Sequence, residues 1–437
     1  MNTIVCKFGG SSLASAEQFR KVKEIIQSDP ARRYVVASAP GKRNAKDIKI
    51  TDLLYRACAA AREGRPYEEI LGTIGGRYDG IASELGIPFD TASEMEALRQ
   101  HLAISPDPEF CASRGEHIGA KLLAAYLGFP FYDAKDGIVF RPDGTLSARR
   151  TDKALGEGLA GLPCAVIPGF YGAEENGRIR TFSRGGSDVT GALAARAVHA
   201  GVYENWTDVS GMLFCDPRIV QDPQTIPYVT YRELRELSYM GASVLHEDAV
   251  FPVSAAGIPI HIMNTNRPGD DGTRIVPALP AGYRMRTVTG IAGKKGFSSI
   301  LIEQSMMNST VGFGAKLLAI LASYGVPFEH CPTGIDTMSV VVETAHFTEH
   351  REEILSDIQK ELMPERVLVE DGLAMIAVVG CGMVASRGCA ARIFRTVADA
   401  GINIRMIDQG SSELNIILGV DEADFEDAIR SIYREFR

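Results

Sequence analysis

The chain has 437 residues, 45% of them hydrophobic, and a formal net charge of −9. This length and composition predict a soluble protein of about two to four domains. The negative charge argues against a nucleic-acid surface, which needs clustered Lys and Arg, so any bound phosphate must be held in a local pocket. No apolar run approaches the ~18 residues of a membrane helix and no signal-peptide pattern is visible, so we expect a cytoplasmic protein without membrane contacts.

Cysteine and histidine spacing excludes two further classes. The eight cysteines form no CxxC pair, and the eight histidines show no HExxH or comparable spacing. The sequence therefore predicts free thiols, without a disulfide framework or a zinc site.

The first informative stretch is IVCKFGGSS, in which an apolar run from Ile4 is followed by Lys7 and a glycine turn of Gly9, Gly10 and Ser11. A helix with the capping box Ser15-x-x-Gln18 comes next. A strand, a glycine turn and a helix N-terminus form an anion site, and Lys7 would add a positive charge. Neither common nucleotide motif, G-x-x-x-x-G-K-[ST] or G-x-G-x-x-G, is present. The alternative is a tight turn with a solvated lysine.

Short apolar runs alternate with helical segments over roughly the first 285 residues. Strands are expected at 34–37, 129–134, 165–168, 202–206 and 258–263. Helices are expected at 15–27, 113–127 and 188–200, the last two with left-handed caps at Gly128 and Gly201. This alternation predicts an α/β fold with a mainly parallel sheet covered on both faces, which binds ligands at the carboxyl ends of its strands.

An internal repeat follows a Pro- and Gly-rich connection at 266–283. The segment that starts at Ala315 matches the one that starts at Ala391, 76 residues later, and a strand near Met338 matches one near Leu414 at the same offset. Each unit is expected to run strand, helix, strand, strand, helix, strand, a ferredoxin-like order. The predicted domains are therefore 1–285, 286–369 and 370–437, and the alternative is two unrelated small α+β units.

Two further stretches offer polar groups at helix or strand ends. Arg184, followed by Gly185, Gly186, Ser187 and Asp188, places a guanidinium, backbone N–H groups and a carboxylate at the mouth of a helix. A simple N-cap explains Ser187 or Asp188 and leaves Arg184 unexplained. A loop after the strand near 202–206 carries Thr207, Asp208 and Arg218, although an ordinary polar turn would look similar.

Two other candidates have a local structural explanation. Glu116 fits a capping box with Ser113, in which the glutamate satisfies a backbone N–H. Thr51 is likewise an ordinary N-cap candidate.

These motifs together resemble an aspartokinase. The likeness is carried by KFGGSS at Lys7, SRGE at Ser113, RGGSD at Arg184, TDVSG with DPR, MGASVLH at Met240, NT at Asn264 and the tandem repeat. The resemblance implies an amino-acid-kinase domain followed by two ACT domains. It also implies ATP-dependent phosphorylation of the side-chain carboxylate of L-aspartate, the first step of lysine, threonine and methionine biosynthesis.

The resemblance also suggests residue roles. Lys7 would bind the transferring phosphoryl group, Asp188 would orient Lys7 and the substrate, and Mg²⁺ would be held by phosphates and water, without a named protein ligand. The substrate ammonium would bind Glu116, the α-carboxylate Arg184, and Thr51 and Ser187 would line the pocket. The nucleotide would contact Gly9, Gly10, Ser11, Thr207, Asp208, Leu213, Arg218 and Ser243.

Two of these positions depart from the family pattern. Many relatives have a lysine where this chain has Ser243, and Leu213 stands where tyrosine is common. Arg218, Lys42 or Arg43 can replace the lost cation, or ATP binds weakly.

The regulatory amino acid, lysine and/or threonine, is expected at the first repeat. Its candidate contacts are Met307, Ser309, Thr310, Phe313, Glu329 and Asp336. Ordinary capping and a surface acid pair would explain the same residues. ACT domains usually pair across subunits, so the resemblance implies a homo-oligomer, a dimer or tetramer. The competing functions are another amino-acid or carboxylate kinase and a non-catalytic amino-acid sensor.

Overall fold

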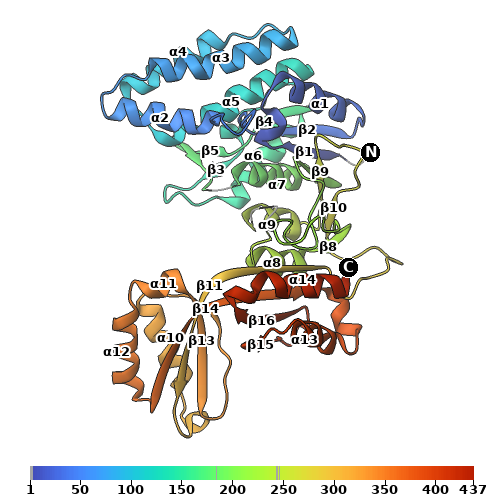
Figure 1. Ribbon diagram of the computed structural model, residues 1–437. Coiled ribbons are helices and arrows are strands. Elements are labelled where there is room, and N and C mark those ends of the chain that lie inside the picture. Colours follow the sequence, from blue (N-terminus) through green and yellow to red (C-terminus); the bar gives the residue numbers. More distant parts are fainter. Residues whose placement is uncertain (1–2, 184, 243–244, 246) are drawn as a thin grey trace. The chain divides into compact units, whose positions relative to one another are not determined.

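The computed structural model describes residues 3–183, 185–242, 245 and 247–437, and the chain divides into two compact units (Figure 1). The first unit comprises Met1–Met212, Thr225–Tyr231 and Val244–Ala281, and the second comprises Leu213–Gln224, Arg232–Ser243 and Gly282–Arg437. Among the described residues, no helix is long and apolar enough to cross a membrane. The sequence-based boundaries at 285 and 369 stay predictions.

The first unit is built on a seven-stranded sheet in the order β4-β2-β1-β7-β9-β10-β8. Its strands are β1 (Ile4–Phe8), β2 (Arg32–Ala37), β4 (Ala165–Pro168), β7 (Val202–Thr207), β8 (Tyr228–Thr230), β9 (Ile260–Asn264) and β10 (Thr273–Val276). The strands from β4 to β9 run parallel, and β10 is antiparallel to β9. The predicted mainly parallel sheet is confirmed.

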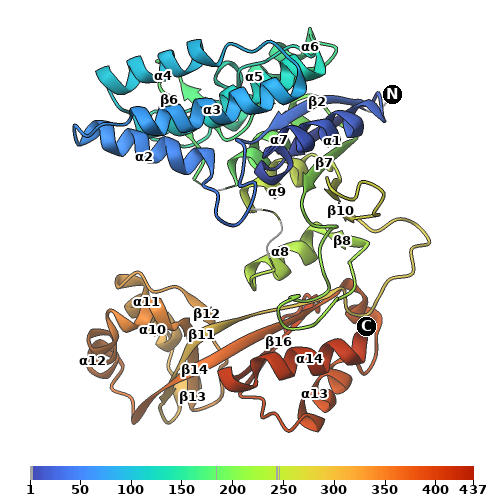
Figure 2. The same cartoon turned by 45° about the horizontal axis from the view of Figure 1, so that its top comes forward.

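Helices cover both faces of this sheet. Helices α1 (Ala16–Gln27) and α5 (Pro108–Leu127) contact β2, and α7 (Gly186–Ala197) packs on the opposite face against β1 and β2 (Figure 1). Helix α2 (Ile50–Arg62) lies against α5, and α3 (Glu68–Leu85) and α4 (Thr91–Ile104) run side by side next to them (Figure 2). The unit also contains α6 (Ala148–Ala160), α9 (Glu247–Ala255) and a small sheet of β3 (Val139–Phe140), β5 (Tyr171–Glu174) and β6 (Ile179–Thr181).

The helix boundaries follow local capping chemistry. The Ser15 side chain caps α1 by accepting a hydrogen bond from the N–H of Gln18, as the capping box predicts. Helix α5 begins earlier than expected, because Asp107 caps it and Pro108 stands in its first turn, so the predicted start at Ser113 is wrong. Gly128 adopts the predicted left-handed conformation at the C-terminus, with φ 70°.

Two other local expectations are also wrong. The segment 129–134 is not a strand, since it forms only an isolated bridge between Phe131 and Val166 and then enters a short 3₁₀ helix. Helix α7 ends at Ala197 instead of reaching 200, and the left-handed residue after it is His199, with φ 50°. Gly201 instead donates a backbone hydrogen bond to Thr3, which leads the chain into β7.

The second unit is built on a six-stranded antiparallel sheet in the order β12-β13-β11-β14-β16-β15. Its strands are β11 (Gly290–Glu303), β12 (Phe328–His330), β13 (Thr337–Glu343), β14 (Arg366–Val379), β15 (Met406–Asp408) and β16 (Asn415–Asp421). Its helices are α10 (Phe313–Ser323), α11 (Thr344–Thr348), α12 (Arg351–Leu362), α13 (Cys389–Asp399) and α14 (Phe425–Phe436), and α8 (Tyr231–Tyr239) belongs here from Arg232 onward.

The two repeats share their long strands. The first repeat runs strand, helix, strand, strand, helix, strand from β11 to β14, as predicted. The second repeat has no final strand after α14, so the prediction is wrong there. The first half of β11 takes that place, because Gly290–Lys295 pairs with Ala374–Val379 of β14. Gly296 (φ 93°) and Gly372 (φ 76°) stand where each strand passes from one repeat to the other.

Candidate active site

The end of β1 carries a buried ion pair. Lys7 Nζ lies 2.6 Å from Asp188 Oδ1, and only 10% of the lysine side chain and 15% of the aspartate side chain are exposed. The same carboxylate oxygen accepts a hydrogen bond of 2.8 Å from the side-chain amide of Asn205 on β7. The structure therefore holds the Lys7 ammonium at the carboxyl end of the central strands, in the arrangement expected for Asp188 as its orienting partner.

The turn after β1 has no room for a side chain at Gly10. A Cβ atom on Gly10 would lie 2.9 Å from the carbonyl oxygen of Ala39, and one on Gly9 would lie 3.6 Å from Lys7 Nζ. The Gly9 N–H is already used, since it donates to the carbonyl of Trp206. Within the described part of the chain, the N–H groups of Gly10 and Ser11 have no partner, and these two are the donors left for an anion.

Glu116 lies in the middle of α5 and does not act as a capping residue. Ser113, its expected partner, instead donates its hydroxyl to the carbonyl of Phe110 within the same helix. Glu116 is 6% exposed, and its Oε2 has no partner among the described residues. Burial raises the pKa of the Glu116 carboxyl to about 8, against smaller opposing effects that include the Ala39 N–H and the Arg114 guanidinium. A buried carboxyl of this kind is complementary to a cationic ligand.

The first turn of α2 lies against the same part of α5. Thr51 is the second residue of α2, and Lys49 occupies the N-cap position, so the N-cap explanation for Thr51 is wrong. A Cβ atom on Gly115 would lie 2.9 Å from Ala39 Cβ and 3.4 Å from Ile50 Cγ2. The close packing at Gly115 therefore places the first residue of α2, Ile50, and the loop after β2, at Ala39, beside the residue that precedes Glu116.

The N-terminus of α7 completes this edge of the sheet. Gly185 precedes the helix in a left-handed conformation, and Ser187 and Asp188 lie inside the helix, so neither is its N-cap. A Cβ atom on Gly169, just after β4, would lie 2.5 Å from Ser187 Oγ, which places Ser187 at the end of β4. Arg184, the expected carboxylate ligand, lies outside the described residues.

Polar groups also gather where β7 and β9 end. Thr207 donates its hydroxyl to the Asp208 carboxylate at 3.2 Å, and the Asn264 side chain donates to the Asp208 carbonyl at 3.3 Å. Sequence reasoning had not singled out Asn205, whose amide fixes Asp188. Two adjacent polar residues inside a buried strand, Glu204 and Asn205, were the available signal.

Three predicted nucleotide contacts do not belong to the described part of the first unit. Leu213 and Arg218 belong to the second unit, where Arg218 is highly exposed and its guanidinium lies 2.6 Å from the Asp216 carboxylate. Ser243 lies outside the described residues.

The expected effector residues divide into two groups within the second unit. Met307 and Phe313 are buried in the core of the first repeat. Ser309 and Thr310 are exposed, Asp336 accepts a hydrogen bond from the Met306 N–H at 2.7 Å, and Glu329 accepts one from the Tyr239 hydroxyl. Core packing therefore accounts for the first two residues, and the exposed loop stays a candidate ligand surface.

The donor set offers no preformed metal cage. In the described ranges, no group of three or more His, Cys, Asp or Glu side chains is arranged to hold a metal ion. Magnesium that accompanies a nucleotide is commonly held through phosphates and water instead.

Comparisons with known proteins agree with this architecture. A model of the amino acid kinase family matches residues 2–264, and an ACT domain model matches residues 376–436. Aspartokinase 3 of Bacillus subtilis (strain 168) is 39% identical over 457 aligned residues, which cover 99% of this chain and 98% of that protein.

Solved structures give the same result. The crystal structure of Clostridium acetobutylicum aspartate kinase superposes with a TM-score of 0.91 at 47% identity and covers 100% of both chains. That of E. coli aspartokinase III in complex with lysine and aspartate has a TM-score of 0.71 at 25% identity and covers 99% of both chains. The chain therefore belongs to the amino acid kinase family and, within it, to the aspartokinases, which makes it an aspartate kinase.

Proposed function

We propose that the enzyme transfers the terminal phosphoryl group of ATP to the side-chain carboxylate of L-aspartate, forming 4-phospho-L-aspartate and ADP. The observation that carries this proposal is the buried Lys7–Asp188 pair beside the crowded Gly10 turn, together with the Glu116 carboxyl, whose Oε2 has no partner among the described residues. A cation and backbone N–H groups suit a phosphate, and an unpaired carboxyl suits the ammonium group of an amino acid.

The reaction needs no general base. The side-chain carboxylate of aspartate is ionised at neutral pH, with a reference pKa near ~3.9. One of its oxygens attacks the γ-phosphorus, the bond from that phosphorus to the bridging oxygen breaks, and the electron pair leaves with ADP. No proton is transferred, so Asp188 is an orienting group.

The barrier arises because two anions must approach each other. Two unit charges 4 Å apart interact by about 4 kcal/mol at an effective dielectric of about 20, which corresponds to roughly a thousandfold in rate. Lys7 would supply such a charge to the transferring group, and Gly10 and Ser11 would donate their N–H groups to it. Magnesium bound with the nucleotide would neutralise further phosphate charge.

The remaining site residues would bind the two substrates. Glu116 would take the ammonium group of aspartate and Arg184 its α-carboxylate, with Thr51 and Ser187 lining the pocket. The nucleotide would contact Gly9, Thr207, Asp208, Leu213, Arg218 and Ser243.

Regulation, assembly and location complete the proposal. Lysine and/or threonine would act as feedback effectors at the second unit, since the similar E. coli enzyme was solved in complex with lysine. The reaction would be the first step of lysine, threonine and methionine biosynthesis in the cytoplasm. Exposed apolar side chains in the first repeat, among them Val311 (100%) and Ile335 (69%), favour a homo-oligomer formed through this unit.

A coupled ADP-release assay with aspartate, glutamate and N-acetylglutamate tests the proposed reaction. We expect turnover with aspartate, and a loss of roughly a thousandfold in kcat for Lys7→Met because the phosphoryl group loses its cation. Lys153→Met, at an exposed position on α6, is the matched control and should keep full activity. Preference for another acceptor would reject aspartate as the substrate, and no turnover with any acceptor would indicate a non-catalytic sensor.

A further inference from the structure

The cations near the phosphate turn differ in whether a carboxylate already neutralises them. Lys7 is paired with Asp188. Arg43 is held by Asp47 through bonds of 2.8 and 3.1 Å, and this pair lowers the pKa of Asp47 well below its usual range. Lys42 stands beside Arg43, is exposed, and forms no ion pair with any residue that the structure describes.

The backbone next to Lys42 is packed onto the phosphate turn. The Gly41 N–H donates to the carbonyl of Gly10 at 2.8 Å. A Cβ atom on Gly41 would lie 2.6 Å from the Gly10 carbonyl carbon and 2.9 Å from the Ser11 nitrogen, so no side chain fits between the two loops. Lys42 therefore directly follows the residue that packs against the N–H groups proposed to bind phosphate.

A buried arginine holds the two ends of the loop between Gly41 and Ile48 by hydrogen bonds. Arg77 on α3 is 7% exposed, and its guanidinium donates to the carbonyls of Gly41 at 2.8 Å and Ile48 at 3.0 Å. These bonds lie on both sides of the segment 42–47 and hold its two ends in place. The start of the Lys42 side chain is thus fixed, while its flexible four-carbon stem leaves the ammonium free to move.

The same loop also borders the proposed aspartate pocket. Ala39 lies three residues before Lys42, its N–H acts on the Glu116 carboxyl, and its Cβ limits the space at Gly115. The loop 39–42 therefore runs from the group proposed to bind the substrate ammonium to the turn proposed to bind phosphate. The backbone of Lys42 therefore lies between the two proposed binding sites, next to the turn of Gly10 and Ser11.

We propose that Lys42 binds the oxygens of the transferring γ-phosphoryl group, as a second cation beside Lys7. Because the Lys7 ammonium is already paired with the Asp188 carboxylate, a second positive group would help to bring the two anions together. Lys42 supplies it without an ion pair to break, and its contact with the γ-phosphate is made in the nucleotide complex. This inference rests on the proposed phosphoryl transfer to aspartate.

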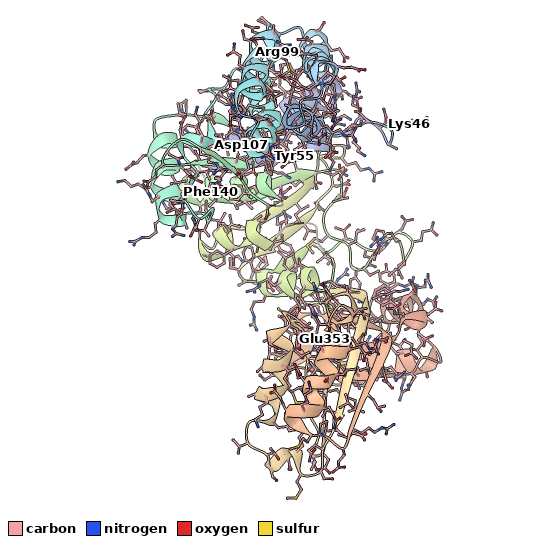
Figure 3. All side chains as sticks on the ribbon, turned by 90° about the vertical axis from the view of Figure 1, so that its left-hand side faces the viewer. Lys46, Tyr55, Arg99, Asp107, Phe140 and Glu353 are labelled. Atoms are coloured by element: carbon pink, nitrogen blue, oxygen red, sulfur yellow. The ribbon has the colours of Figure 1, made fainter. Side chains whose placement is uncertain are left out.

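Lys42→Met tests the assignment, with Lys46→Met as the matched control. Lys46 carries the same charge on the same loop but stands at its outer edge (Figure 3). We expect Lys42→Met to lower kcat about 10- to 100-fold and to weaken binding of a non-hydrolysable ATP analogue about tenfold, with ADP affinity and the melting temperature unchanged. Lys42→Arg should recover most of the activity, because it restores the charge.

Several results would overturn the assignment. They are equal kinetics for Lys42→Met and Lys46→Met, an equal loss of affinity for ADP and for the ATP analogue, or a rise in the KM for aspartate alone. The unmodified enzyme in the same assay separates this test from that of the proposed function. If it does not phosphorylate aspartate, the function itself is rejected, whereas a difference between the two lysine variants concerns Lys42.

Discussion

At the scale of single residues, Glu116 combines burial with an unused hydrogen-bonding atom. A buried carboxyl group with one oxygen lacking a partner destabilises the folded protein in its ionised form, so it takes up a proton until a cation binds. In the free enzyme the raised pKa of about 8 means that the group is largely protonated at neutral pH. Binding of the substrate ammonium would favour ionisation, which couples aspartate binding to proton release.

The KM for aspartate should depend on pH through this group. Because the ionised carboxylate binds the ammonium, we expect the KM to fall by up to about tenfold per pH unit as pH rises toward 8, and to level off above it. Glu116→Gln should raise the KM strongly and remove this dependence. Initial rates measured from pH 6 to 8.5 would show it, and a KM that is flat for the unmodified enzyme would contradict the role of Glu116.

The same group should affect stability in the opposite sense. Its folded-state pKa is raised from 4.5 to about 8, so its contribution to stability is fully present below pH 4.5 and is lost as pH rises through 8. Glu116→Gln removes this loss. We therefore expect the variant to gain stability relative to the unmodified enzyme between pH 5.5 and pH 8.5, measured by urea unfolding. An equal difference at both pH values would show that the pKa of Glu116 is not raised.

At the scale of elements, hydrogen bonds to the buried carboxylate of Glu204 join the central strands. Glu204 on β7 accepts hydrogen bonds from Arg32 Nε at 2.8 Å, Trp206 Nε1 at 2.8 Å and Cys6 Sγ at 3.3 Å. Its side chain is 6% exposed. The cluster connects β1, β2 and β7, which are the strands whose ends carry Lys7, the loop to Lys42, and Thr207.

Glu204→Leu should destabilise the protein by about 3–5 kcal/mol, because it leaves the Arg32 charge buried without a carboxylate partner. Glu68→Gln is the control: it removes a pair with Arg99 whose side chains are 60% and 42% exposed, and should cost less than about 1 kcal/mol. Urea denaturation of both variants would measure the two free energies of unfolding. Similar small losses would mean that the cluster does not stabilise the sheet.

At the scale of the whole molecule, the two repeats form one cooperative sheet. β11 and β14 each run through both repeats, and β14 is flanked by β11 on one side and β16 on the other. Removing the first half of β11 would leave β14 with a long exposed apolar edge, which favours aggregation. The second repeat thus depends on residues that precede the first.

Fragments can test this dependence. We expect residues 282–437 to fold as a soluble unit, because this fragment retains both long strands, whereas residues 370–437 alone should be unfolded or aggregated. Circular dichroism and size-exclusion chromatography would distinguish the two outcomes. A folded 370–437 fragment would show that the β11 segment is dispensable and would support the sequence-based boundary at 369.

Features that depend on local chemistry or on internal similarity could be predicted from the amino-acid sequence. The capping box of α1, the left-handed Gly128, the parallel α/β pattern and the repeat at an offset of 76 residues were all readable from neighbouring residues or from self-comparison. The start of α5 was missed, because Ser113 resembles a cap and only the buried residues before it show that the helix continues.

Which distant groups meet, and which polar atoms stay without a partner, depends on the folded arrangement of the chain. Lys7 meets Asp188 and Asn205 because the parallel strands β1 and β7 end at the edge where α7 begins, and no local pattern encodes that pairing. The sequence also could not show that Glu116 Oε2 lacks a partner, or that the first half of β11 pairs with the second repeat. Burial and strand pairing are set by contacts between residues far apart in the chain. Local propensity determines where helices and strands form, and long-range packing determines how the charged side chains of the site are placed.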